Sequence, residues 1–278
     1  MENIPRIPLG SWIESALVFL TSEYSVVTRA ISRFTQSGIN SLNDALMWLP
    51  EWALMALIAL LCWRLASSRL AIGAVAGLAL IWNMDLWNPM IETLTLVVIA
   101  TLVAVVIALP IGILAALSDR LYRVIMPILD FMQTMPAFVY LIPAIPFFGI
   151  GAVSAIFATV IFSMPPAIRF TTLGIRQVPS DLIEAADAYG ATRSQKLFKV
   201  QLPLSLPTVM AGINQTIMLA LSMVVIAAMI GADGLGSEVW RAIQRLRPGD
   251  GFEAGIAVVI LAMLLDRLTQ ALRKSKRQ

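Results

Sequence analysis

The residues that most often carry out chemistry in proteins are scarce in this chain. Its 278 residues include no histidine and one cysteine, Cys62. These two facts exclude an internal disulfide, a Cys/His metal cluster and histidine-based acid–base catalysis. The sequence also lacks Gly-x-x-x-x-Gly-Lys-Ser/Thr, the loop that cradles nucleotide phosphates. We therefore expect no catalytic residue, metal ligand or cofactor on this chain, and ATP hydrolysis, if the protein uses it, must belong to a separate subunit.

The segment from Gln133 to Gly151 combines polar, aromatic and proline residues within an apolar run. It reads QTMPAFVYLIPAIPFFGIG, and its prolines remove backbone donors at membrane depth. Backbone exposed in this way is tolerated only where it is buried in protein or lines a wet cavity. We expect a broken helix beside a transport path, lined by Gln133, Thr134, Pro136, Phe138 and Tyr140. The alternative for each aromatic ring is simple packing between helices.

Polar residues also interrupt a later apolar run. Asn214, Gln215 and Thr216 follow one another, and Ser222 lies seven residues beyond Gln215, on nearly the same helix face. Asn214, Gln215 and Ser222 either line the same path or form hydrogen bonds between helices, a common role in lipid. Asp130 is expected near a helix end, paired with Arg123 or another neighbour.

The composition is that of a membrane protein. Hydrophobic residues make up 59%, charged residues 13%, and the mean hydropathy is +0.83. Crossing a bilayer takes about 20 apolar residues as a helix. We therefore predict an all-α integral membrane protein with about seven spans: Met47–Leu65, Leu70–Leu86, Ile91–Leu117, Pro127–Phe148, Ala152–Arg169, Thr208–Gly231 and Phe252–Leu268.

Charge bias predicts the orientation of these spans. Cytoplasmic loops are enriched in Lys and Arg. Most of the 20 basic residues fall in alternate segments, namely Arg64 and Arg69, Arg120 and Arg123, Arg169 to Lys199, and Arg267 to Arg277. We expect the N-terminus outside and the C-terminus inside, with Arg64 and Arg69 in a tight turn and residues 174–207 in the cytoplasm.

The first 46 residues are predicted to form an external amphipathic tail rather than a signal peptide. Apolar residues recur there at steps of three and four, as on one stripe of a helix: Ile13, Leu17, Leu20, Tyr24, Val27, Ile31 and Phe34. This helix should lie flat on a surface, which is either lipid or the protein itself. Contact with a partner protein is the alternative.

Local rules predict helix, turn and helix between Gly174 and Pro207. Pro179 and Ser180 open the first helix, with acidic residues in its first turn. Gly190 ends that helix in a left-handed conformation. Thr192 and Gln195 form a capping box for a second helix, which Pro203 should limit.

The same stretch carries a spacing that identifies a family. Residues 184–203 read EAADAYGATRSQKLFKVQLP, and the positions of Glu184, Ala185, Ala186, Gly190 and Pro203 resemble the EAA loop of importer-type ABC permeases. In that family the loop grips a separate ATPase. The resemblance therefore implies that Glu184 makes the polar contact and Gly190 sets the turn, with the face formed by Leu182, Ala185, Ala186 and Tyr189 pressed into a groove.

Three further segments narrow the resemblance to one branch. Gln133–Gly151, Ala108–Leu117 and the stretch IGADGLG from Ile230 to Gly236 resemble the permeases for glycine betaine, proline and choline. The implied fold is a MetI-like type I permease core of five helices in residues 91–278, preceded by two extra spans in residues 47–90. In such a path, aromatic faces would suit a quaternary ammonium.

The resemblance also implies the partners. We expect two cytoplasmic ATPase subunits that bind ATP and Mg²⁺, a second permease copy, membrane lipid and no nucleic acid, at a bacterial inner membrane. Because the sequence ends at Gln278, we expect the substrate-binding protein to be a separate external chain. Trp240, Arg241, Arg245 and Arg247 could form an outer gate or its docking surface, or simply a solvated short helix.

Two other functions remain open from sequence. One is a permease of the same architecture for an amino acid or another small polar solute. The other is a self-sufficient secondary transporter or channel. Two features argue against it: such a protein would not need a cytoplasmic loop for an ATPase, and this sequence lacks the paired ionisable residues within the membrane that would form its relay.

Overall fold

The computed structural model describes residues 8–275, and all regular structure within them is helical. The basic residues of the tail beyond Ser275 lie outside this range, so their predicted cytoplasmic position is not described. The N-terminal half contains α1 (Leu9–Glu23), α2 (Ser25–Met47), α3 (Glu51–Leu65), α4 (Ser68–Asn83), α5 (Trp87–Leu117), α6 (Asp119–Thr134), the 3₁₀ turn η1 (Ala137–Tyr140) and α7 (Leu141–Phe148). The C-terminal half contains α8 (Ala152–Arg176), α9 (Ser180–Ala188), α10 (Arg193–Lys196), the π-helical turn η2 (Leu197–Gln201), α11 (Leu202–Ser222), α12 (Val224–Ala228), α13 (Leu235–Gln244) and α14 (Pro248–Ser275).

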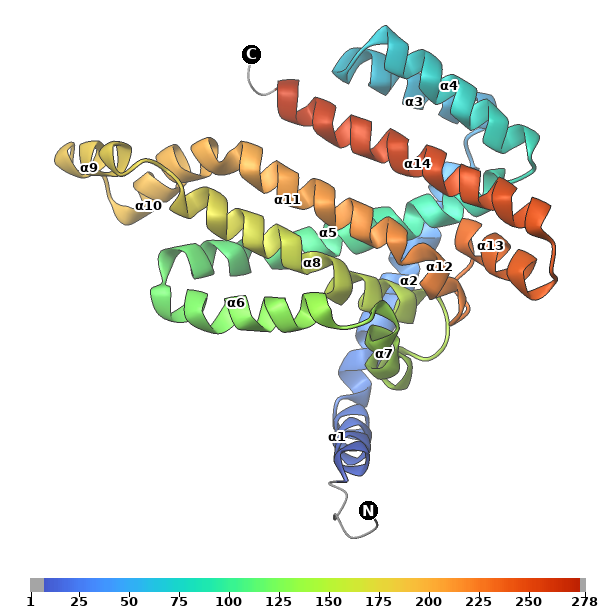
Figure 1. The fold of residues 1–278 in the computed structure, drawn as a ribbon, viewed down its shortest axis with the longest axis horizontal. Helices are drawn as coiled ribbons and strands as arrows, with labels where there is room; N and C mark the ends of the chain where they lie inside the picture. Colours follow the sequence, from blue (N-terminus) through green and yellow to red (C-terminus); the bar gives the residue numbers. More distant parts are fainter. Residues whose placement is uncertain (1–7, 276–278) are drawn as a thin grey trace, which may run out of the picture.

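The long helices form one bundle. In Figure 1, α5, α8, α11 and α14 run broadly side by side, with α9 and α10 at one end and α13 at the other. α5 and α8 run in the same direction, because Thr172 of α8 donates to the Gly112 carbonyl at 3.0 Å and both residues lie towards the carboxyl ends of their helices. α11 then returns along α8, and a Cβ on Gly212 would lie 2.7 Å from the Phe170 Cβ. These helices therefore pack with their backbones close together.

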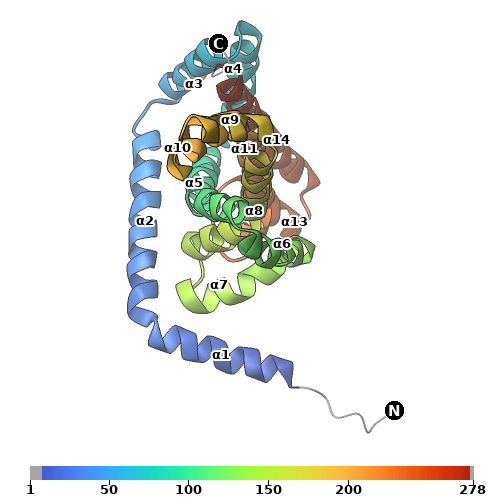
Figure 2. The same ribbon diagram turned by 90° about the vertical axis from the view of Figure 1, so that its left-hand side faces the viewer.

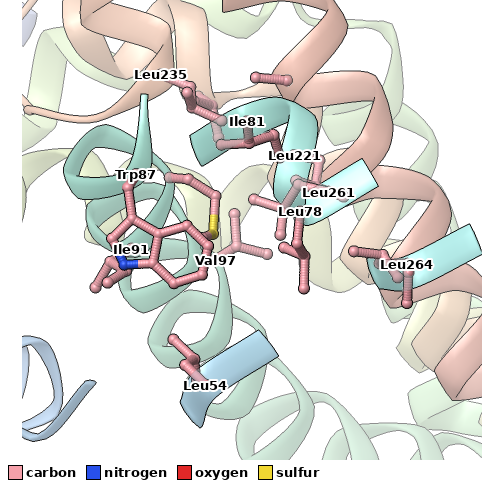
Figure 3. Packing of buried hydrophobic residues seen from close by; sticks show 14 of the residues in the cluster. Leu54, Leu78, Ile81, Trp87, Ile91, Val97, Leu221, Leu235, Leu261 and Leu264 are labelled. Atoms are coloured by element: carbon pink, nitrogen blue, oxygen red, sulfur yellow. The ribbon is translucent and has the colours of Figure 1, made fainter. Parts of the chain in front are cut away.

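The core holding the bundle together consists of separate apolar clusters, each formed by several helices. Figure 3 shows its largest cluster, where Trp87 and Ile91 of α5 meet side chains of α3, α4, α11, α13 and α14. The labelled members are Leu54, Leu78, Ile81, Trp87, Ile91, Val97, Leu221, Leu235, Leu261 and Leu264. A second cluster joins α5, α7, α8 and α12. The amino ends of α5 and α13 are thus fixed by burial.

All seven apolar runs predicted from the sequence are mainly helical, although some of them include turns or breaks, and their lengths support fewer simple crossings. Within residues 8–275, three continuous helices are long and apolar enough to span a bilayer: Trp87–Leu117, Ala152–Arg176 and Arg193–Ala228. Two bent pairs, α2 with α3 and α6 with α7, would raise the number to five. Part of the difference arises because α3 and α4 have only 15 and 16 residues, short of the roughly 20 that a crossing takes.

The predicted turn at Arg64 and Arg69 is confirmed. α3 and α4 form a helical hairpin, and the Ser67 hydroxyl caps α4 by accepting from the Leu70 N–H at 3.3 Å. The two arginines flank the turn, Arg64 in the last turn of α3 and Arg69 in the first turn of α4. The charges therefore avoid the middle of either helix.

The N-terminal tail differs from the single helix that the stripe predicts. It consists of α1 and α2, which meet at Tyr24, and Figures 1 and 2 show α2 running across the long helices instead of along them. The partly buried positions of α2 are mostly small and polar, and α2 packs on α5, α7 and α8. These positions include Ser25, Thr28, Ser32, Thr35 and Ile39.

The apolar stripe of the tail faces outward instead. Phe34 is 83% exposed, and Val27 and Ile31 are also exposed. Small hydroxyl side chains let α2 approach the bundle closely, which leaves the larger apolar residues on the outer side. That the outer side rests on lipid remains a prediction.

Candidate functional site

The predicted cytoplasmic loop is built as two short helices joined by a turn. α9 begins directly after Pro179, whose φ of −53° suits the residue before a helix, and Asp181 lies in its first turn. α8 and α11 meet where the loop begins and ends, since a Cβ on Gly174 would lie 3.0 Å from the Thr208 Cβ. The loop therefore projects from a tightly closed base, as Figure 1 shows for α9 and α10.

The turn after α9 has the geometry that the sequence predicts. Gly190 has φ +74°, and the N–H groups of Gly190 and Ala191 donate to carbonyls of Asp187 and Ala186 at 2.9 Å each. A left-handed residue just past the helix end closes the open carbonyls of the last turn in this way. The prediction for Gly190 is confirmed.

The capping box is also confirmed. The Thr192 hydroxyl accepts from the Gln195 N–H at 3.3 Å, and the Gln195 side chain accepts from the Thr192 N–H at 2.8 Å. Reciprocal bonds of this kind fix where a helix starts. The start of α10 is therefore set by local sequence.

The loop is cross-linked by an ion pair that sequence patterns did not predict. Lys196 Nζ lies 2.6 and 2.8 Å from the two carboxylate oxygens of Asp187. The pair joins the end of α9 to α10 across the Gly190 turn. The nine-residue separation has no helical periodicity, which is why the sequence gives no signal for it.

Pro203 does not end the second helix, which corrects the prediction. The helix runs without interruption from Arg193 to Ala228, and the π-helical turn η2 lies immediately before α11. Pro203 occupies one of the first two positions of α11. A proline is accepted there because the wider π turn rearranges the preceding hydrogen bonds, so that the missing N–H leaves no gap in a regular ladder.

The exposed surface of α9 has two different sides. Leu182 and Tyr189 are exposed, Tyr189 by 93%, and Ala185 lies between them on the same side. Ala186 is partly buried, whereas Glu184 is exposed. Because successive residues are separated by about 100°, Glu184 lies on nearly the opposite side of α9 from Leu182. The apolar face and the acidic group would therefore meet different parts of any partner.

An arginine fixes the base of the loop to the bundle. Arg176, at the end of α8, donates to Asp119 at 2.7 Å and to the Ala115 carbonyl at 3.2 Å. Its guanidinium also lies 4.2 Å from the centre of the Tyr122 ring, a cation–π contact. The carboxyl ends of α5 and α8 and the first turns of α6 are thus held together, again by contacts that the sequence did not reveal.

The broken helix predicted at Gln133–Gly151 is confirmed. α6 and the segment Ala137–Phe148 meet at an angle of 111°, with the break at Met135 and Pro136. Gln133, Thr134 and Pro136 are exposed, and Phe138 is 52% exposed. These four residues lie free on the surface of the single chain.

Tyr140 is placed differently from its neighbours. It is buried, its hydroxyl donates to the Met132 carbonyl, and its ring packs edge-on against Phe162 at 5.6 Å. These contacts favour the packing alternative for Tyr140. Asp130 pairs with Arg169 at 2.5 Å, so its partner is a neighbour on α8 and not Arg123.

The three polar residues of α11 also separate. Asn214 donates to Asp266 of α14 at 2.8 Å, so it forms a hydrogen bond between helices. Gln215 and Ser222 are exposed on the surface of α11. The sequence placed all three in one set, and only Gln215 and Ser222 share an open face.

The arginine-rich segment after α12 forms the short helix α13. Arg241 pairs with Glu238 at 3.2 Å, and Arg247 with Asp250 at 3.6 Å. Beside them an apolar groove of about 500 Å³ lies between α13 and α14, lined by residues that include Ile243, Leu246 and Phe252. The segment combines basic side chains with an open apolar surface.

Comparison with known proteins gives a consistent result. The family described as "Binding-protein-dependent transport system inner membrane component" matches residues 108–278. The chain is 48% identical over 277 residues to "Glycine betaine transport system permease protein OpuAB" of Bacillus subtilis (strain 168), covering 100% of this chain and 98% of that protein. It is 51% identical over 285 residues to "Glycine betaine/carnitine transport permease protein GbuB" of Listeria monocytogenes serotype 1/2a (strain 10403S), covering 99% and 98%.

Structural comparison agrees with the sequence comparison. A chain of the MetNI methionine ABC transporter, solved in inward-facing conformations, is similar with a TM-score of 0.62 and 25% identity. The similarity covers 66% of this chain and 92% of that chain.

Proposed function

This chain belongs to the family of binding-protein-dependent transport system inner membrane components, and on that premise we propose that it is the permease subunit of an ATP-driven importer for a quaternary ammonium osmolyte. Glycine betaine is the leading substrate. The observation that carries the proposal is similarity over the whole chain to relatives whose names specify glycine betaine transport. The methionine transporter shares less of the chain and supports the architecture more than the substrate.

The α9–α10 loop is the proposed contact with the ATPase. Its first helix offers an exposed side formed by Leu182, Ala185 and Tyr189, which would fill a groove on the partner. Glu184, on the other side of α9, would bind a basic or hydrogen-bonding group at the rim. Two ATPase subunits, each with ATP and Mg²⁺, would act on two permease loops.

The second permease copy is proposed from the open polar face of the bundle. Gln215 and Ser222 are exposed on a long apolar helix, and polar groups facing lipid are unfavourable. A second copy would enclose them in a shared path, to which Gln133, Thr134, Pro136 and Phe138 contribute. Tyr140, which is buried, would support this path from behind.

The membrane placement follows the same reasoning. We propose a multi-pass subunit of the bacterial inner membrane, with residues 174–207 in the cytoplasm and α13 outside. The groove between α13 and α14 and the nearby arginines would then face the external binding protein. ATP and its Mg²⁺ would be bound by the ATPase subunits and not by this chain.

Reconstitution tests the proposal. The chain would be placed in proteoliposomes with its ATPase inside and its binding protein outside, and uptake of radiolabelled glycine betaine measured. We expect uptake that needs all three proteins and ATP, with competition by choline or proline betaine but not by methionine. Flux through the chain without the ATPase would contradict the proposal.

A further inference from the structure

The bundle contains a second polar site, far from the α9–α10 loop, that transport by the path above does not use. It is a cavity of about 180 Å³ between α2, the first turns of α5 and α8, and the turn before α13. Six of its ten lining residues carry side-chain oxygens. They are supplied by Gln36, Asn40, Asn43, Glu92, Thr95 and Asp233.

The cavity contains buried oxygens that lack the hydrogen bonds such groups need. Thr95 is 1% exposed, and its hydroxyl has no hydrogen-bond partner within the described part of the chain. The side-chain oxygen of Asn43 also has no hydrogen-bond partner among the described residues, whereas the nitrogen of the same amide donates to the Met47 sulfur at 3.6 Å. An unsatisfied buried polar group is unfavourable. Two in one cavity indicate that something else normally contacts them.

Two carboxylates line the same cavity. Glu92 is partly buried on α5, and Asp233 comes from the turn Ile230–Gly236. Like charges that share a site repel each other unless a cation lies between them. The nearby guanidinium of Arg241 is already paired with Glu238 at 3.2 Å and donates to Ser237 at 2.9 Å.

The turn that carries Asp233 is held in place by its backbone. Gly231 and Gly234 have φ of +82° and +121°, and the Leu235 N–H donates to the Thr93 hydroxyl at 2.8 Å. A Cβ on Gly234 would lie 2.5 Å from that hydroxyl oxygen. The turn is therefore docked on α5 one residue from Glu92, which brings the second carboxylate to a fixed position.

We propose that this cavity binds a hard divalent cation, with Ca²⁺ as the best fit. Each of these six side chains can offer an oxygen, the ligand type that Ca²⁺ prefers, from carboxylate, amide or hydroxyl groups. The Asn40 oxygen accepts from the Gln36 amide at 2.8 Å and would exchange this bond for the ion. Its two carboxylates balance a charge of +2. At about 30 Å³ per water molecule, the volume holds an ion and several waters, which suits the flexible coordination of Ca²⁺ better than the strict octahedron of Mg²⁺.

The cation would join the N-terminal tail to the bundle. Gln36, Asn40 and Asn43 lie on successive turns of α2, whereas Glu92, Thr95 and Asp233 belong to the bundle. α2 also meets the bundle through small polar residues and through Ile39 and Leu46, which pack against the buried clusters of the core, but none of its side chains is fully buried. An ion between the two parts would add to this attachment.

Calcium binding to the isolated full chain tests this inference without the ATPase or a transported solute, so its result is independent of the proposed transport function. The chain would be placed in nanodiscs of zwitterionic lipid and titrated with CaCl₂ by calorimetry, with empty nanodiscs as the blank. We expect one Ca²⁺ per chain with a Kd of about 10⁻⁴–10⁻³ M, as in extracellular Ca²⁺ modules. Hydrogen exchange of α2 amides around residues 36–43 should slow when Ca²⁺ is added.

Variants distinguish a binding site from a structural feature. Glu92→Gln and Asp233→Asn keep the shape and should each weaken binding at least about tenfold, whereas Asp85→Asn is the matched control. Asp85 is an exposed carboxylate with φ +57°, which asparagine tolerates, so this change should leave binding unaltered. Thr95→Val should lower Ca²⁺ affinity and yet leave thermal unfolding without Ca²⁺ unchanged or raised, since it removes an unsatisfied hydroxyl.

Several results would overturn the inference. One is the absence of saturable binding up to about 10 mM CaCl₂, a concentration about ten times the weakest expected Kd. Another is equal binding by wild type, Glu92→Gln and Asp233→Asn. Equal heats with NaCl, MgCl₂ or choline chloride would exclude a site for Ca²⁺. Loss of binding in Asp85→Asn would show that the carboxylates of the cavity are not the ligands.

Discussion

Replacement of Gly190 tests whether the backbone of the α9–α10 turn, and not its surface, carries the coupling. Gly190 has φ +74°, where an L residue costs about 1–2 kcal/mol. No heavy atom lies within 4 Å of a Cβ placed there, so the added side chain meets nothing. Gly190→Ala and Gly190→Arg should therefore carry the same backbone cost. Gly190→Asn should cost less, because asparagine adopts this conformation more readily.

The other interactions that hold the turn are of similar size. The Lys196–Asp187 pair is partly exposed and contributes about 1 kcal/mol or less. The Thr192 cap contributes about 1 kcal/mol. A loss of 1–2 kcal/mol changes the ordered fraction of such a turn by up to about 5–30-fold. We expect uptake by the Ala and Arg variants to fall by up to this factor.

The assay is the proteoliposome system described above, with uptake and ATP hydrolysis measured together. Gly190→Asn should stay near wild type, while Gly190→Ala and Gly190→Arg should transport fewer molecules per ATP. If Gly190→Ala behaves as wild type and only Gly190→Arg fails, bulk at the partner surface is the cause and the backbone reasoning is wrong. Failure of Gly190→Asn to the same degree as Gly190→Ala would refute it equally.

Three further experiments test other residues. Glu184→Lys should lower transport per ATP hydrolysed by at least about tenfold, or about 1.4 kcal/mol, while the chain still inserts; unchanged uptake would remove Glu184 from the ATPase contact. Gly236→Ala places a Cβ 2.3 Å from a backbone carbonyl of α12 and should reduce the free energy of unfolding in detergent by about 3 kcal/mol. The control is Gly73→Ala, whose Cβ would have no atom within 4 Å; it should raise the free energy of unfolding by about 0.5–1 kcal/mol. Asn214→Ala removes a hydrogen bond to a charged group and should cost about 1.5–3 kcal/mol by the same measurement. Asp266→Asn should cost less because its side-chain oxygen can still accept from Asn214; equal losses would show that this hydrogen bond is not what matters.

Local features of the loop could be predicted because they depend on residues a few positions apart. The Gly190 turn, the Thr192–Gln195 box and the break near Pro136 each follow from the conformational limits of one or two residues. The prediction that Pro203 limits the second helix is wrong for the same reason. A single proline does not reveal that the preceding turn will widen into a π helix and admit it.

Contacts between distant segments could not be predicted. The Asp119–Arg176 and Asp130–Arg169 pairs join helices whose relative register depends on the whole bundle. The tail illustrates a different limit. Its apolar period is real, but hydroxyl residues pack α2 on the bundle, because close approach of backbones in a membrane protein favours small side chains over large ones.

The clamp at Arg176 also determines how far a small movement travels. α8 has 25 residues, so at 1.5 Å per residue it is about 37 Å long, and a tilt of 10° about its carboxyl end moves its amino end by about 6 Å. Because Arg176 also holds Asp119 and the Ala115 carbonyl, α5 and α6 must tilt with it. A tilt of α8 driven at α9 would therefore displace the opposite end of the helix most. There Ala152 and Ile156 form one wall of the oxygen-lined cavity beside α2, so such a tilt would alter the proposed cation site.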